Sequence, residues 1–160
     1  MAESFAERWA RKEHECGLDT IAATMVPCGA DWLPDSTAPR LTFRQAAEPA
    51  PVWEVYADSS DWTQLDRELL AAYKVIGSDG SGNPICLDEG SGAVVILDPD
   101  YRFRALQLVN SSVRQLGECL LAYLGEQDGG RFRAAVEAID PAALAERSFW
   151  WREAENLNAD

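Results

Sequence analysis

Hydrophobic and polar positions recur with different periods along the chain, and these periods predict the order of its elements. Residues 3–15 carry apolar side chains at helical spacing and stop before Gly17, which predicts a helix. Residues 20–26 form a short apolar run that suits a strand or an apolar turn. Residues 27–40 hold three prolines and a glycine, and therefore predict a loop.

Two further strands and a helix are predicted before residue 73. Residues 41–45 alternate between apolar and polar side chains, as a half-buried strand does. The prolines within residues 49–51 interrupt the chain, and residues 52–57 then alternate again. From Leu65 to Tyr73 the period becomes helical. We therefore expect strand, strand and helix in this part of the chain.

The next block consists of short apolar runs separated by tight turns. The runs lie at residues 73–77, 84–88, 93–97 and 103–109. A parallel crossover needs a dozen or more residues, so connections this short predict an antiparallel β-meander. The run at 93–97 is apolar at every position, which suits a central strand covered on both faces.

Helical periodicity returns after residue 110. One helical face collects the apolar positions Val113, Leu116, Leu120, Tyr123 and Leu124. Ser112 followed by Gln115 fits a capping box, in which the hydroxyl and the amide each satisfy a backbone N–H. Asn110 or Ser111 could serve as the cap instead.

The C-terminal part of the chain predicts further helices. The first helix is expected to end near residues 129–130, where two glycines occur, and a second to occupy residues 131–139. Asp140 followed by Pro141 has the pattern of an N-cap with proline at the first helical position. Residues 148–157 predict a last short helix.

Segregated blocks of helices and strands indicate the α+β class. The expected architecture is a central antiparallel β-meander sheet flanked by N-terminal and C-terminal helices. A chain of 160 residues without internal repeats is long enough to bury a core and predicts a single domain over residues 1–160.

Charge adds a preference for one class of partner. The formal net charge is −13, which argues against direct binding of nucleic acid because phosphates would be repelled. The excess is concentrated in residues 48–100, where eleven acidic residues face only Arg67 and Lys74. Such a field can steer a basic partner, although a solvated acidic face is the common alternative.

Compartment and redox state follow from two absences in the sequence. It contains no run of 18 apolar residues and begins with a charged segment, which predicts a cytoplasmic protein that does not enter a membrane. The four cysteines are widely spaced and form no CxxC pair. Buried reduced thiols are therefore expected at Cys16, Cys28, Cys86 and Cys119.

A glycine-rich stretch at residues 77–84 has some features of a ligand loop. It lacks the lysine of a phosphate-binding loop, and a strand rather than a helix follows it. Asp79, Ser81 and Asn83 alternate as calcium ligands do, but Pro84 and Gly90 stand where that loop requires glycine and glutamate. The stretch predicts a turn between two strands, with a calcium or small-ligand site as a minor alternative.

Catalytic chemistry has little support in the sequence. His14 is the single histidine and lies among charged residues on the first predicted helix, where an exposed position is expected. No metal site, catalytic residue or cofactor is predicted, and we expect a protein that is not an enzyme. Among the tryptophans, Trp53, Trp150 and Trp151 are expected in the core, and Trp62 is the best exposed candidate.

Three segments resemble a known family in the same order. Residues 73–98, 109–123 and 138–151 are similar to the SUKH superfamily of bacterial immunity proteins, most closely to its fourth subfamily. The resemblance extends roughly from Trp32 to Trp151, and residues 1–27 match weakly. It implies an α+β fold and a non-enzymatic protein that binds and blocks a cognate toxin, often a nuclease or a nucleic-acid deaminase.

The resemblance separates residues of the fold from residues of the contact. The shared motif residues, expected to be structural, are Gly77, Asp79, Gly80, Gly82, Pro84, Asn110, Ser111 and Ser112. The acidic middle third supplies the candidate partner-binding residues Asp58, Asp61, Trp62, Asp66, Asp88 and Glu89. The expected partner is a basic toxin domain. A regulatory or scaffold module that binds a cellular protein is the alternative, and no oligomeric state is predicted.

Overall fold

The structure is a computed structural model that describes residues 2–18, 24–43 and 50–158. The first half contains α1 (Phe5–Glu15), β1 (Met25–Cys28), β2 (Asp31–Pro34), β3 (Ser36–Thr37), β4 (Leu41–Phe43), β5 (Ala50–Pro51), α2 (Val52–Val55), the 3₁₀ turn η1 (Ala57–Ser59) and α3 (Gln64–Leu70). The second half contains β6 (Tyr73–Ser78), β7 (Pro84–Asp88), β8 (Val94–Asp98), η2 (Pro99–Tyr101), β9 (Ala105–Asn110), α4 (Val113–Tyr123), α5 (Gly129–Ile139), η3 (Pro141–Leu144) and α6 (Phe149–Leu157).

The main sheet confirms the predicted meander. Its strands lie in the order β3-β4-β6-β7-β8-β9, β5 also pairs with β6, and every pairing is antiparallel. On β8, Val94 contacts the apolar cluster on one face of the sheet, whereas Val95 and Leu97 contact the cluster on the other. This strand is therefore covered on both faces, as its unbroken apolar run predicts.

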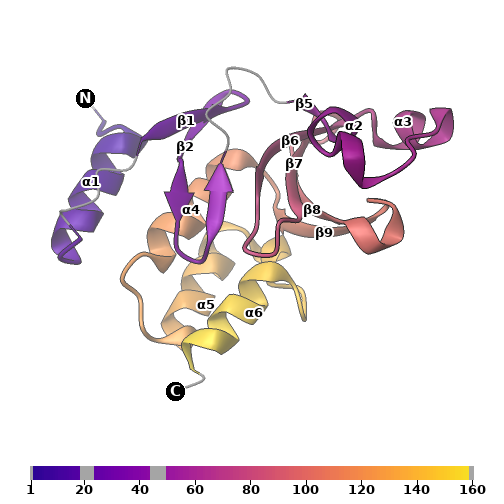
Figure 1. Cartoon of the computed structure of the whole chain (residues 1–160). Coiled ribbons are helices and arrows are strands. Elements are labelled where there is room, and N and C mark those ends of the chain that lie inside the picture. The colour runs from indigo at the N-terminus through magenta and orange to yellow at the C-terminus, as the bar shows by residue number, and fades with distance from the viewer. Residues whose placement is uncertain (1, 19–23, 44–49, 159–160) are drawn as a thin grey trace.

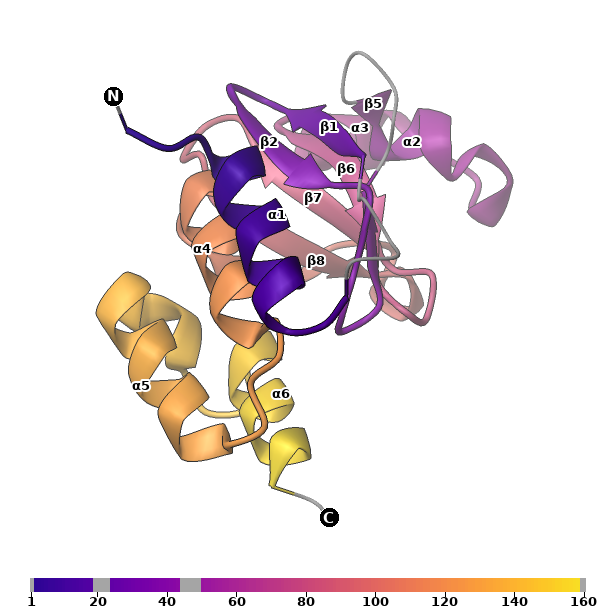
Figure 2. The same cartoon turned by 90° about the vertical axis from the view of Figure 1, so that its left-hand side faces the viewer.

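Helices cover the two faces of the sheet unequally. The larger cluster lies between the sheet and α4, α5 and α6, and includes Leu116, Phe132 and Trp150. The smaller one lies under α2, η1 and α3, and includes Val52 and Leu70. Both views of the fold show α2 and α3 on the side of the sheet away from α5 and α6 (Figures 1 and 2). We call the segment from Val52 to Leu70 the outer layer.

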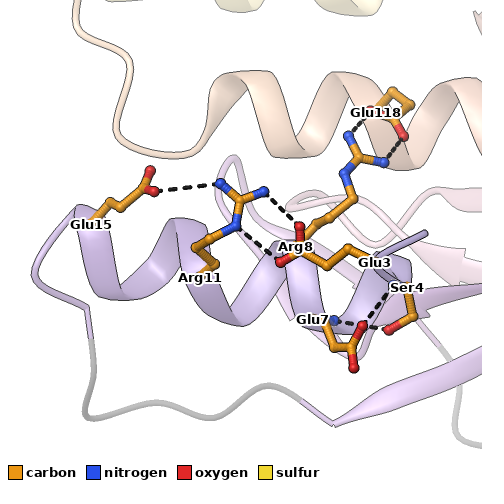
Figure 3. Close-up of polar contacts among 7 residues, drawn as sticks. All are labelled: Glu3, Ser4, Glu7, Arg8, Arg11, Glu15 and Glu118. Carbon is orange, nitrogen blue, oxygen red and sulfur yellow. Dashed lines mark hydrogen bonds and ion pairs between the residues drawn. The ribbon is translucent and has the colours of Figure 1, made fainter. Parts of the chain in front are cut away.

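The predicted N-terminal helix is present and lies beside α4 (Figure 2). Its start is closed by a capping box between Ser4 and Glu7, and Gly17 follows its end with a φ of 72°. The Arg8 guanidinium meets both carboxylate oxygens of Glu118 on α4 (Figure 3). Trp9 is 4% exposed beneath it. The helix is therefore anchored by one bidentate ion pair and one buried indole.

The predictions for residues 27–40 and 52–57 are wrong. Residues 27–40 contain the hairpin β1–β2 rather than only a loop, because Pro27 and Pro34 sit in a two-stranded sheet where a missing N–H is tolerated. Residues 52–57 are helical at their start, where the Tyr56 N–H donates to the Val52 carbonyl at 2.9 Å. That turn places Val52, Trp53 and Tyr56 against the smaller cluster. Parts of the predicted strands, residues 20–23 and 44–45, and residue 49 of the predicted break lie outside the described residues.

The boundary between the first two C-terminal helices also differs from the prediction. α4 ends at Tyr123, and Gly125, with a φ of 76°, turns the chain. Gly129 begins α5 instead of ending α4. A Cβ at Gly129 would lie 2.3 Å from the Ala154 carbonyl oxygen, so glycine lets the start of α5 approach α6. The glycine pair marks a close contact between two helices rather than a stop.

The Asn110–Ser112 motif joins the sheet to these helices. Ser112 caps α4 by accepting from the Gln115 N–H, but the Gln115 amide donates to the Ile139 carbonyl, so only half of the predicted capping box forms. Asp140 precedes η3 without capping it. Its carboxylate accepts instead from the Asn110 amide at 3.0 Å and from the Ser111 N–H at 2.7 Å.

The glycine-rich stretch is a turn between β6 and β7. The Asp79 carboxylate accepts from the backbone N–H groups of Ser81 and Asn83, each at 2.9 Å, and Gly82 has a φ of 82°. Gly77 serves a different purpose, because a Cβ there would lie 2.2 Å from the Thr42 carbonyl oxygen of β4. Within this motif, aspartate and glycine therefore shape the turn and allow two strands to pack.

The four cysteines are free thiols, as expected, but Cys16 is half-buried rather than buried, which corrects the prediction for that residue. Cys28, Cys86 and Cys119 are 0% exposed, and burial raises the pKa of each thiol to about 12. We predict that Ellman's reagent reacts within minutes with one thiol, Cys16, in the native protein and with all four in guanidinium. Cys16→Ser should abolish the native reaction, and rapid reaction of a second thiol would contradict the buried positions.

Candidate protein-binding surface

The outer layer carries the first two candidate residues on its solvent side. Asp58 lies in η1 and Asp61 in the loop before α3, and both are exposed. Glu54 on α2 and Glu68 on α3 are exposed as well. Arg67 is the one basic residue in the outer layer. The layer therefore presents a surface with excess negative charge, at the place where the acidic composition of residues 48–100 suggested it.

Asp66 does not belong to this surface, which corrects the prediction. Its side chain is 0% exposed, and its carboxylate accepts from Arg102 at 2.5 Å and from Arg104 at 2.7 Å. The Thr63 N–H and hydroxyl each donate to the same carboxylate at 2.9 Å. The bond from Arg102, followed by the backbone bond from Thr63, holds the pKa of Asp66 well below its usual value. Asp66 fixes α3 to the β8–β9 connection.

Trp62 is less exposed than predicted. Its indole ring packs on Phe103 with the ring centroids 5.1 Å apart, and its Nε1–H donates to the Tyr56 carbonyl at 3.1 Å. The Tyr56 hydroxyl donates in turn to the Gly82 carbonyl at 2.9 Å. Trp62 therefore supports the loop that carries Asp61 from beneath. Among described tryptophans, Trp32 on β2 has the large exposed fraction, 56%.

The three tryptophans that are expected in the core are buried to different extents. Trp150 is 0% exposed and stacks on Phe149 with the centroids 4.8 Å apart. Trp53 and Trp151 are half-buried, the former against the smaller cluster and the latter under the Arg133 guanidinium. His14 is exposed on α1, as predicted.

Asp88 and Glu89 lie at the other end of α3. Asp88 pairs with Tyr73 across β7 and β6, and the Glu89 N–H donates to the Ala72 carbonyl at 2.9 Å, just after the helix. The Asp88 carboxylate accepts from the Gly90 N–H and the Ser91 hydroxyl, and Glu89 lies 3.6 Å from the Lys74 ammonium. Their charge is thus partly engaged locally. Asp58 and Asp61 therefore lie at one end of α3, and Asp88 and Glu89 lie at the other. The helix between these two pairs is about 10 Å long.

The structure also exposes apolar side chains on α2 and α3. Leu65 and Leu69 on α3 are 53% and 50% exposed, whereas Asp66 and Leu70 face the sheet at 0% and 2%. Val55 on α2 is 38% exposed. Both pairs on α3 have the same four-residue spacing, so periodicity alone could not show which pair is buried. Asp66 and Leu70 are the buried pair because the Asp66 carboxylate binds Arg102 and Arg104.

The described carboxylates and helices also bear on metal binding and on membrane insertion. Within residues 2–18, 24–43 and 50–158, no group of three or more histidine, cysteine, aspartate or glutamate side chains is placed to hold a metal ion. The Asp79 carboxylate, first of the potential calcium ligands, is engaged by its own turn. No helix in these ranges is long and apolar enough to cross a membrane.

Comparison with known proteins bears on the whole domain. A family model described as SUKH-4 immunity protein matches residues 19–156. No curated protein and no solved structure matches the chain. The matched region includes the main sheet, the outer layer and α4 to α6. It begins at residue 19, so α1 lies outside the matched region.

Proposed function

This chain belongs to the SUKH-4 immunity protein family, and we propose that it neutralises a cognate toxin domain by binding it through the outer layer. Family membership carries the proposal as to class, since an immunity protein acts on a toxin. The proposed contact residues are the exposed acids Asp58 and Asp61, with Asp88 and Glu89 at the far end of α3. We infer a non-enzymatic, cytoplasmic inhibitor that needs no cofactor.

Electrostatics supports a basic partner of the nuclease or nucleic-acid deaminase type. Such a toxin needs a cationic cleft for the phosphates of its substrate. The exposed acids of the outer layer would meet that cleft with opposite charge. Charges at such a contact act chiefly on the association rate, and their effect decreases as salt increases. An inhibitor with this surface would compete with nucleic acid for the same positively charged side chains of the toxin.

Charge reversal at two positions tests the proposal. We predict that Asp58→Lys/Asp61→Lys slows association with the toxin by about tenfold to hundredfold at low salt, while folding is preserved because both carboxylates are exposed. The probe is the purified C-terminal domain of the protein encoded immediately upstream, with association followed by stopped-flow fluorescence. Cells that express this toxin domain should no longer be protected when the double variant replaces the unaltered protein.

A matched control separates local contact from net charge. Glu137→Lys/Glu146→Lys changes the net charge equally, at exposed positions on α5 and after η3, on the other side of the sheet. It should retain most of the association rate. Equal slowing by both double variants would mean that overall charge, rather than the outer layer, governs binding. Unchanged association in the first variant would reject the proposed surface.

A further inference from the structure

Two half-exposed leucines lie on one side of α3. Leu65 and Leu69 are four residues apart, so their side chains are neighbours along one stripe of the helix. Their side chains are 53% and 50% exposed. We call this pair the leucine stripe. A single exposed leucine is ordinary, but an aligned pair on a short surface helix offers apolar area that a partner can bury.

The outer layer holds this stripe in a fixed orientation. α3 begins with a capping box between Thr63 and Asp66, and its inner side is held by the buried Leu70. The ion pairs of Asp66 with Arg102 and Arg104 attach the same turn to the β8–β9 connection. A surface that is already ordered loses little conformational entropy on binding. The two leucines are therefore held in a fixed position before any partner binds.

The charged side chains near the stripe are mostly acidic and restrict its partner. Asp61 precedes α3, and Arg67 and Glu68 lie between the two leucines in sequence. All three are exposed, so the acids exceed the base by one. A second copy of this chain would carry the same net charge of −13, which opposes self-association. A basic protein with an apolar hollow among lysines and arginines fits both the leucines and the acids. This charge complementarity favours the toxin itself as the occupant.

We propose that the leucine stripe is the apolar anchor of the toxin complex, bound in an apolar hollow at the rim of the toxin's cationic cleft. The proposal rests on the proposed function and divides the contact into two roles. The acids set how fast the complex forms, and the leucines set how long it lasts, because desolvated apolar anchors act mainly on the dissociation rate.

The experiment compares rates for the same toxin domain. Leu65→Ser/Leu69→Ser should raise the dissociation rate about 100-fold and leave the association rate within about threefold. Asp58→Lys/Asp61→Lys should show the reverse pattern. Trp32→Ser is the matched control, since Trp32 is 56% exposed on β2, which packs with the larger cluster on the other face of the sheet. Circular dichroism and melting temperature verify folding, and Leu69→Ser alone provides a milder variant.

Each outcome decides a separate point. Tight binding that persists in both leucine variants rejects the leucine stripe but leaves the proposed function standing. Faster dissociation in Trp32→Ser, with the leucine variants unchanged, would move the anchor to β2. A dimer of the unaltered protein in analytical ultracentrifugation, lost in Leu65→Ser/Leu69→Ser, would assign the stripe to a second copy. No binding or protection by the unaltered protein would reject the proposed function and the anchor together.

Discussion

Asn110→Ala is expected to lower the free energy of unfolding by about 4 kcal/mol, because it leaves several buried polar groups without partners. The Asn110 side chain is 0% exposed. Its amide donates to the Asp140 carboxylate at 3.0 Å, and its carbonyl accepts from the Trp150 Nε1–H at 2.8 Å. One side chain thus connects the end of β9 to η3 and α6. Urea denaturation followed by tryptophan fluorescence and circular dichroism measures the loss.

Neighbouring substitutions separate this network from a general effect of the segment. Ser111→Ala removes another donor to the Asp140 carboxylate but at an exposed residue, and should cost about 1 kcal/mol. Trp150→Phe removes the indole donor. Because Asn110→Ala and Trp150→Phe delete the same hydrogen bond, the double variant should lose less stability than the sum of the single losses. Strict additivity would contradict a shared network.

Asp66→Asn is expected to lower the melting temperature by roughly 10 °C, because the charged acceptor between Arg102 and Arg104 is lost. The Asp66 pKa is lowered in the folded protein, so the contribution of this carboxylate is fully present above its unfolded value of 3.8. It decreases as the pH falls below 3.8 towards the folded-state pKa. The variant should therefore lose less stability than the unaltered protein across that acidic range.

Asp58→Asn is the control for Asp66→Asn. It neutralises an exposed carboxylate in the same outer layer and should move the melting temperature by no more than about 2 °C. Melting curves of both variants at neutral pH and in the acidic range provide the comparison. If Asp66→Asn melts like Asp58→Asn, the buried ion pairs do not hold the layer. Reversing Asp66 to lysine would confound folding with binding, so it is unsuited to mapping the surface.

The proposed division of roles places stability and recognition on different residues of α3. Asp66 and Leu70 fix the helix to the sheet, while Leu65 and Leu69 remain available on its other side. Residues outside α3 show the same separation, because Gly77, Asp79 and Asn110 serve strand packing, a turn and a buried network.

Much of the fold could be read from local patterns. The meander follows from short apolar runs and turn residues such as Gly82, because tight turns impose antiparallel neighbours. The start of α4 follows from Ser112, whose hydroxyl needs only a backbone N–H three residues away. The hairpin β1–β2 and the helical turn at Val52 could not be read in this way. Edge position made Pro27 acceptable in a strand, and contact with the smaller cluster favoured a helix at Val52.

By itself, the sequence determined the α+β class, the antiparallel sheet, the family resemblance and the acidic middle third, because period, turn chemistry and composition are local or additive properties. Only the tertiary structure decided which acids and leucines face solvent. Leu65/Leu69 and Asp66/Leu70 share one helical spacing, and the choice between them depends on Arg102 and Arg104, which follow Asp66 by 36 and 38 residues. A buried carboxylate is stable only where its counter-charges arrive from elsewhere in the chain, and those contacts turn the leucines outward.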